Sequence, residues 1–177
     1  TNGSNSKAPR TVQVSGQLIP KDAIGSAHEV TGALIGTWYF PDDPFNKVYY
    51  ESDTRIFARG AEYFKGCVNL NGNAKCDASE PSGIAYGEYM YWTLLDSNKR
   101  LVDGGCTHAF TGGSKAFKGA RGVFHMRDVF SATSPAGSVA GYHGEIILNA
   151  VNERELVKTA ATTVGARTAS GGKPTGC

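Results

Sequence analysis

The chain has 177 residues, with 18 Lys or Arg against 16 Asp or Glu. This nearly neutral balance without a run of like charges argues against a surface for nucleic acid or anionic membranes, so we expect neither partner. The length fits one domain with its own core, and no apolar stretch reaches the roughly 20 residues of a bilayer-crossing helix, so we expect no membrane span.

Alternation of apolar and polar residues with a period of two runs through most of the chain and predicts β-strands. In chain order these cover Arg10–Ile19, Glu29–Phe40, Lys47–Ala58, Ala61–Leu70, Gly83–Leu95, Arg100–Phe110, Gly122–Phe130 and Tyr142–Val151. Segments rich in turn-forming residues separate them, as in consecutive antiparallel hairpins. Such an all-β chain fits a closed barrel or a sandwich, because both hide strand edges.

Polar segments flank the predicted strands. We predict an N-terminal tail at residues 1–10, a β-barrel domain at 11–151 and a C-terminal extension at 152–177. Both tails are too poor in apolar residues to offset the entropy lost on ordering. We therefore expect a homo-oligomer whose subunits order the tails, with a disulfide at Cys177 as a second anchor.

The four cysteines lack the Cys-x-x-Cys spacing of zinc and redox sites. Cys67 and Cys76 bracket a short loop and are predicted to pair with each other. The pair Cys106 and Cys177 then follows by elimination. Disulfides indicate an oxidising compartment, so we predict a secreted protein, extracellular or periplasmic. Four unpaired thiols in a cytosolic protein are the alternative.

A glycine-rich segment joins two of the predicted strands, and its residues resemble the signature before a late strand of the allene oxide cyclase and dirigent proteins. The matching residues are Gly112, Gly113, Ser114, Phe117, Gly119, Ala120 and Gly122. The resemblance implies a single antiparallel eight-stranded β-barrel of the calycin-like kind, often trimeric, with a hydrophobic small molecule in its lumen. One branch of the family steers an isomerising ring closure, and another orients radical or quinone-methide coupling. The disulfide loop and polar tails depart from the plant members and indicate a distant, bacterial relative.

The loop between the first two cysteines has the spacing of an EF-hand-like calcium site. Its candidate ligands, at offsets 1, 3, 5, 7, 9 and 12, are Asn69, Asn71, Asn73, the Lys75 carbonyl, Asp77 and Glu80. Asparagine replaces three expected acids, and Ala74 stands where the turn favours glycine. A calcium site and an asparagine-rich, disulfide-closed turn are both compatible with this pattern, and we expect no other cofactor.

Two predicted strands carry a face that mixes aromatic and ionisable side chains. Tyr86, Glu88, Met90 and Trp92 share one face, and His125 shares another with Arg127. If these faces line a lumen, Tyr86, Met90 and Trp92 contact a ligand, and the candidates for acid–base catalysis are Glu88, His125, Tyr86 and Arg127. In the other interpretation the charged side chains form a solvated outer face.

Two classes of function remain. A secreted barrel can bind a hydrophobic small molecule and act as an isomerase, a cyclase or a dirigent-type steering protein, which predicts a cavity. A non-catalytic extracellular structural or assembly module predicts instead a filled lumen and large subunit contacts.

Overall fold

The computed structural model describes residues 8–22, 25–130 and 138–149, and within them the predicted all-β fold is confirmed. No α-helix occurs in this part of the chain, and none of its segments has the length and hydropathy of a membrane-spanning helix. The strands are β1 (Arg10–Pro20), β2 (Ala27–Gly32), β3 (Leu34–Tyr39), β4 (Lys47–Tyr50), β5 (Arg55–Val68), β6 (Ser82–Leu95), β7 (Leu101–Gly113), β8 (Arg121–Phe130) and β9 (Ser138–Leu148). Most of both predicted tails lies outside the described residues.

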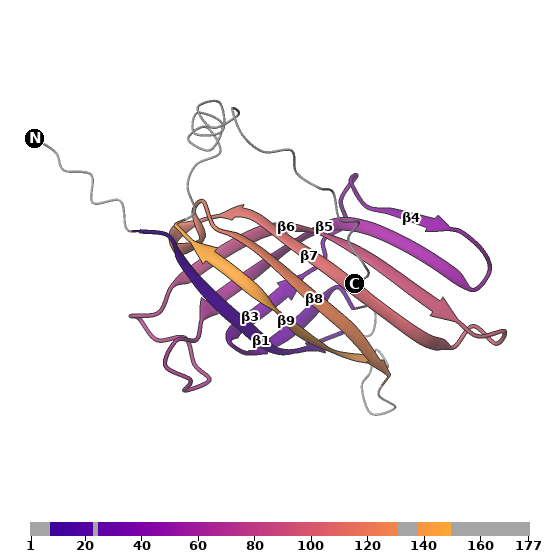
Figure 1. The fold of residues 1–177 in the computed structure, drawn as a ribbon, viewed down its shortest axis with the longest axis horizontal. Coiled ribbons are helices and arrows are strands. Elements are labelled where there is room, and N and C mark those ends of the chain that lie inside the picture. The colour runs from indigo at the N-terminus through magenta and orange to yellow at the C-terminus, as the bar shows by residue number, and fades with distance from the viewer. Residues whose placement is uncertain (1–7, 23–24, 131–137, 150–177) are drawn as a thin grey trace, which may run out of the picture.

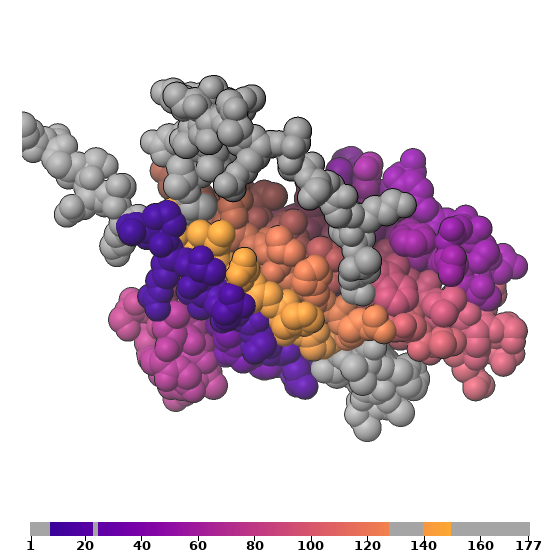
Figure 2. Space-filling view, viewed as in Figure 1, coloured from indigo at the N-terminus to yellow at the C-terminus, as the bar shows by residue number. Residues whose placement is uncertain are grey.

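The strands form one antiparallel sheet that closes on itself. Its order is β3-β2-β1-β9-β8-β7-β6-β5-β4, and an additional pairing of β3 with β5 completes a ring of eight strands. β4 pairs with the first residues of β5 and lies outside this ring, as Figure 1 shows. Figure 2 shows β1, β9 and β8 side by side on one face of the barrel. The predicted eight-stranded barrel is thus confirmed, with one further strand outside it.

The prediction of a single strand over Glu29–Phe40 is wrong, because the chain turns between β2 and β3. Gly32 has a φ of +95°, a backbone conformation that glycine adopts without strain. The Ala33 amide donates to the Ser15 carbonyl at 2.9 Å, which holds the turn against β1. Alternation continues on both sides of the turn, so the period alone does not reveal it.

The boundary predicted between Ala58 and Ala61 is also wrong, since β5 continues unbroken through these residues. The chain reverses earlier, where the amides of Glu51 and Ser52 donate to the Arg55 carbonyl at 3.1 and 3.2 Å. Apolar and polar residues alternate on both sides of this reversal as well. The ring has the predicted number of strands, although the predicted strands Glu29–Phe40, Lys47–Ala58 and Ala61–Leu70 are divided differently in the structure.

The glycine-rich segment connects β7 to β8 as predicted, and these strands pair with each other. Between them lies the single 3-10 turn η1 (Lys115–Phe117), which places the Phe117 side chain in the core. Its ring packs edge-on against Phe64 at a centroid distance of 6.0 Å. Aromatic side chains fill this end of the lumen, and the fully buried ones are Trp38, Phe64, Phe110, Phe117 and Phe124.

Candidate functional site

A pocket of about 620 Å³ opens at the other end of the barrel. Its walls are inward-facing side chains of β1, β2, β6, β7, β8 and β9, and loop residues after β3 form part of its rim. The mainly apolar side chains that line it are Leu18, Phe40, Tyr91, Met126 and Ala140. The lining side chains with polar groups are Ser26, His28, Asp42, Asn46, Tyr89 and His108. We call this cavity the mouth pocket.

A buried carboxylate–imidazole pair lies at the inner side of the mouth pocket. Glu62 on β5 and His108 on β7 are only 3% and 1% exposed. The Nδ1 atom of His108 lies 2.6 Å from Oε2 of Glu62, and the Trp38 indole Nε1–H donates to the same oxygen at 2.9 Å. Hydrogen bonds of this kind are needed to keep ionisable groups in an interior.

The alternation of the strands explains why these two groups face inward. Glu62 stands in phase with Phe64 on β5, and His108 stands in phase with Cys106 and Phe110 on β7. All three of these neighbours are buried. The strand period therefore places both ionisable side chains in the lumen, where they meet although 46 residues separate them along the chain.

Several polar atoms around the mouth pocket have no hydrogen-bond partner within the described part of the chain. They include Oε1 of Glu62, Nε2 of His108 and Nδ1 of His28, all of them buried. A buried polar atom without a partner costs about 1–3 kcal/mol. Such atoms are uncommon in folded proteins and are often associated with functional sites.

Burial keeps two other polar groups of the pocket neutral. It lowers the pKa of His28, an effect that nearby Asp22 opposes and His108 reinforces. Burial likewise raises the pKa of the Tyr89 hydroxyl, with Cys106 and Glu62 acting in the same direction. The His28 ring packs edge-on against Phe40 at 5.3 Å, and Phe40 in turn against Tyr89 at 5.4 Å. The entrance thus combines aromatic rings with the neutral polar groups of His28 and Tyr89, and the carboxylate of Asp42 also lines it.

The predicted ligand-contacting face of β6 lies on the outside of the barrel and not in the lumen, and contact of these residues with a ligand stays a prediction. Tyr86 and Met90 are 51% and 65% exposed, and Glu88 is exposed between them. Trp92 lies on the same outer face, beneath the Arg127 guanidinium at 5.4 Å. Alternation separates the two faces of β6 correctly, but both carry aromatic residues, so composition alone does not reveal which one faces inward.

The candidates on β8 also face outward. Arg127 donates from Nη2 to both carboxylate oxygens of Asp103 at 2.9 Å, and the His125 ring lies beside that of His143 at 5.8 Å. The four predicted catalytic candidates, Glu88, His125, Tyr86 and Arg127, therefore do not converge on the mouth pocket. The interpretation of these side chains as a solvated outer face agrees with their positions.

Sequence reasoning missed Glu62 and the pairing role of His108. A signal was present in the stretches "GAEYF" and "CTHAF", where an ionisable residue falls in phase with an aromatic one two positions later. An acid and a histidine in the buried phase of two strands predict a buried pair, because neither is stable there alone. The sequence did not reveal that the side chains of these two strands meet inside the lumen.

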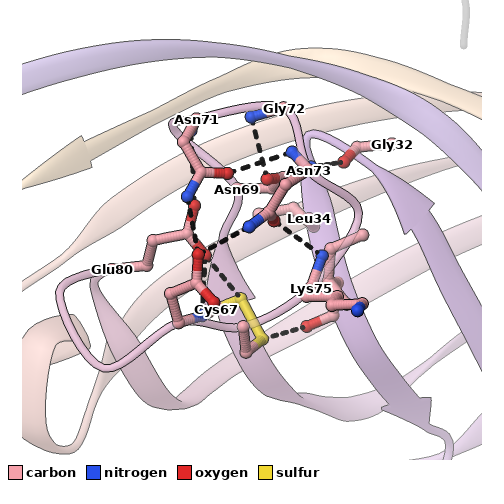
Figure 3. The surroundings of a disulfide bond; sticks show 12 residues. Gly32, Leu34, Cys67, Asn69, Asn71, Gly72, Asn73, Lys75 and Glu80 are labelled. Carbon is pink, nitrogen blue, oxygen red and sulfur yellow. Dashed lines mark hydrogen bonds between the residues drawn. A yellow bond between two sulfur atoms is a disulfide. The ribbon is translucent and has the colours of Figure 1, made fainter.

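The predicted disulfide between Cys67 and Cys76 is confirmed, with an S–S distance of 2.03 Å. Figure 3 shows the loop that it closes. Cys106 is buried in the wall of the mouth pocket, and Cys177 lies outside the described residues. The pairing of these two cysteines therefore stays a prediction.

The candidate calcium ligands form hydrogen bonds within their own loop. The side-chain oxygens of three asparagines accept backbone N–H groups: Asn69 from Gly72, Asn71 from Asn73 and Asn73 from Lys75, at 3.0–3.1 Å. Oδ2 of Asp77 accepts the side-chain amides of Asn71 and Asn73, while Glu80 accepts the backbone amides of Asn71 and Asp77, as Figure 3 illustrates in part.

These contacts describe an asparagine-rich turn, and calcium binding there stays a prediction. Across the described residues, no group of three or more His, Cys, Asp or Glu is arranged to hold a metal ion. A melting temperature that is higher in Ca²⁺ than in chelator would support the site, since a ligand of the folded state alone raises stability. An unchanged melting temperature would assign the loop to the turn.

Comparisons of the chain with protein-family models, with curated proteins and with solved structures find no match.

Proposed function

We propose that this protein binds a neutral, mainly hydrophobic small molecule in the mouth pocket. The supporting observation is a cavity of about 620 Å³ at the open end of the barrel. Pockets for small ligands are typically about 300–1,000 Å³ and combine apolar walls with a few polar atoms. The aromatic rings of Phe40, Tyr89 and Tyr91 supply flat apolar surface, and the nearby polar atoms orient the ligand.

The charge state of the pocket favours a neutral ligand. His28 is kept neutral by its lowered pKa, and Tyr89 stays protonated because its pKa is raised. The carboxylate of Glu62 is already paired with His108 and Trp38. An anionic group on a ligand would lose its hydration without gaining a cationic partner, because the lining residues include the carboxylate of Asp42 and no Lys or Arg of the described chain.

Binding of the neutral dye Nile red, read by its fluorescence, tests this proposal. Ala140→Phe should fill part of the mouth pocket and weaken dye binding at least about tenfold, equivalent to 1.4 kcal/mol. Val123→Phe adds the same ring on the outer face and should bind the dye like the unchanged protein. Equal binding by all three proteins, or none by any, would contradict the proposal. Native mass spectrometry of the purified protein would identify a copurifying ligand.

We extend the proposal to location and relationship. The disulfide supports a secreted, extracellular or periplasmic protein, and fractionation of the producing cells tests that. The eight-stranded barrel and its glycine-rich connection, which buries Phe117, support the proposed relationship to the allene oxide cyclase and dirigent proteins. An enzyme of that type would be an isomerase or cyclase acting on the molecule in the pocket.

A second candidate function is assembly through β4. This strand has exposed apolar side chains, with Tyr50 75% and Val48 50% exposed. Within the described residues it pairs only with β5, so its other edge is available to a strand of a second copy. Light scattering tests this: Tyr50→Lys should reduce the mass to that of a monomer, whereas Val123→Lys on the barrel's outer face should not. A monomeric unchanged protein would exclude assembly.

A further inference from the structure

We propose that His108 is a general base, positioned by Glu62, that takes a proton from the ligand in the mouth pocket. This inference rests on the proposed binding function and adds a reaction to it. It uses a buried carboxylate and a buried imidazole that contact each other, and it assigns a role to an imidazole nitrogen that has no partner in the described residues.

The hydrogen bonds of the pair determine which nitrogen carries the proton. Oε2 of Glu62 accepts the Trp38 N–H, and Nδ1 of His108 lies 2.6 Å from the same oxygen. With Glu62 ionised, its carboxylate can only accept, so Nδ1 carries the hydrogen of this bond. In the neutral imidazole, Nε2 is then a bare acceptor, which is the form in which histidine acts as a base.

The surroundings hold the imidazole in one orientation at the pocket wall. The Trp38 ring packs edge-on against the His108 ring at 5.0 Å, and the rings of Phe40 and Tyr89 each lie 6.3 Å away. His108 is itself a lining residue of the mouth pocket, with Nδ1 turned to Glu62 and Nε2 buried without a partner in the described residues. A fixed base reacts faster than a free one because its orientation does not have to be found in the transition state.

The proton transfer balances without a further reactant. The proton goes to Nε2, its bonding electrons remain on the ligand, and the Glu62 carboxylate stabilises the imidazolium that forms. Return of the proton to another atom of the same ligand completes an isomerisation. The substrate class is therefore a neutral, mainly apolar molecule with a C–H made acidic by an adjacent carbonyl or ring heteroatom.

Other titratable groups that face the pair are less suited to this role. Tyr89 has a raised pKa and stays protonated, so it can donate a hydrogen bond but does not accept a proton. Burial lowers the pKa of His28, which makes its imidazole a weaker base. The remaining titratable groups lining the pocket are Asp42, Tyr91 and Cys106.

A reaction of 5-nitrobenzisoxazole tests the base directly. A base takes the proton on its C3 atom, the C–H electrons form the third bond of a nitrile, and the ring N–O bond breaks to give a coloured phenolate. With this probe we expect a saturable rate at least about 100-fold above an equal concentration of free imidazole. His108→Ala should lose this rate, and the outer-face control His125→Asn should keep it.

Glu62→Gln tests the positioning role. The neutral amide no longer stabilises the imidazolium that forms, and its NH2 group can donate to Nδ1 instead of accepting from it, so kcat should fall at least about tenfold while KM for the probe stays nearly constant. Nitrogen-15 NMR of the imidazole reports the tautomer independently of activity. Protonated Nδ1 and bare Nε2 are expected in the unchanged protein, and a mixture is expected in the variant.

The outcomes separate this inference from the binding proposal. If Nile red binds but the probe reacts no faster than with free imidazole, or His108→Ala keeps the rate, the base assignment fails and the binding function stands. A probe that does not displace bound Nile red also counts against the inference, because it belongs to the proposed ligand class. If His108→Ala does not fold, NMR of the unchanged protein still tests the base assignment. A neutral His108 imidazole that carries its proton on Nε2 would overturn the assignment.

Discussion

Tyr142 on β9 links three strands through one hydroxyl group. Its Oη accepts the backbone N–H of Leu34 at 3.0 Å and donates to the Thr31 carbonyl at 2.9 Å. The side chain is buried, and burial raises its pKa to about 12, although the bond from Leu34 opposes the shift. The folded state therefore favours the protonated hydroxyl of Tyr142 over the phenolate.

Replacing Tyr142 with phenylalanine should make the free energy of unfolding less dependent on pH in the alkaline range. Because the folded-state pKa of about 12 lies above the ordinary 10.0, the extra stability is present below pH 10 and is lost as the pH rises towards 12. We expect the free energy of unfolding to fall by about 2–3 kcal/mol more in the unchanged protein than in Tyr142→Phe over this window. Urea unfolding at a series of pH values measures the difference, and parallel curves would contradict it.

Ala74 in the disulfide loop has a φ of +59°, which strains a residue with a Cβ atom. Ala74→Gly should therefore stabilise the protein by up to about 1 kcal/mol, seen as a higher midpoint in urea. Ala61→Gly in extended β5 is the matched control and should destabilise it. If Ala74→Gly also loses stability, the positive φ of Ala74 is not a source of strain, and the prediction is wrong.

At the scale of an element, the connection between β7 and β8 is a plug for one end of the barrel. The 3-10 turn directs Phe117 into the lumen, where it is fully buried against Phe64. The Ser114 amide donates to the Ile84 carbonyl at 2.8 Å, and its hydroxyl accepts the Ile84 amide at 3.2 Å. The small residues of this segment let a connection approach β6 closely enough for the ring to enter the core.

Removal of the plug should be costly. Phe117→Ala should lower the free energy of unfolding by about 3–5 kcal/mol, because it leaves a cavity among other aromatic rings. Phe57→Ala removes a ring that is 43% exposed on the outer face and should cost less than half as much. Chemical unfolding of both variants makes the comparison, and similar losses would contradict the assigned role.

At the scale of the whole molecule, the barrel closes where β3 meets β5. Gly36 lies opposite Gly66 in this seam, and the pairs Trp38 with Phe64 and Leu34 with Val68 flank it. A Cβ at Gly66 would collide with the Ile35 carbonyl of the facing strand. Closure therefore requires two backbones to approach without side chains between them.

A methyl group in the seam should weaken closure. Gly66→Ala should destabilise the protein by about 1–3 kcal/mol, and hydrogen exchange should rise first in β3 and the second half of β5. Gly112→Ala is the control, since a Cβ there has no heavy atom within 4 Å, and it should change stability by less than about 0.5 kcal/mol. Uniform exchange across all strands of Gly66→Ala would contradict a local seam.

The sequence by itself determined the all-β class, the Cys67–Cys76 disulfide and the connection between β7 and β8, because these follow from local period, spacing and turn residues. The period left a barrel and a sandwich both open, and the eight-stranded barrel was only implied by the resemblance of the glycine-rich segment; the pairing of β3 with β5 decided it. Only the tertiary structure decided which face of β6 points inward, since both faces are aromatic and burial depends on the opposite wall. Only it brought Glu62 and His108 together, 46 residues apart in the chain and 2.6 Å apart inside the lumen, from the two strands that flank β6. Alternation gives each strand two faces. Barrel closure determines which face points into the lumen, and it brings side chains that are distant in the chain into contact.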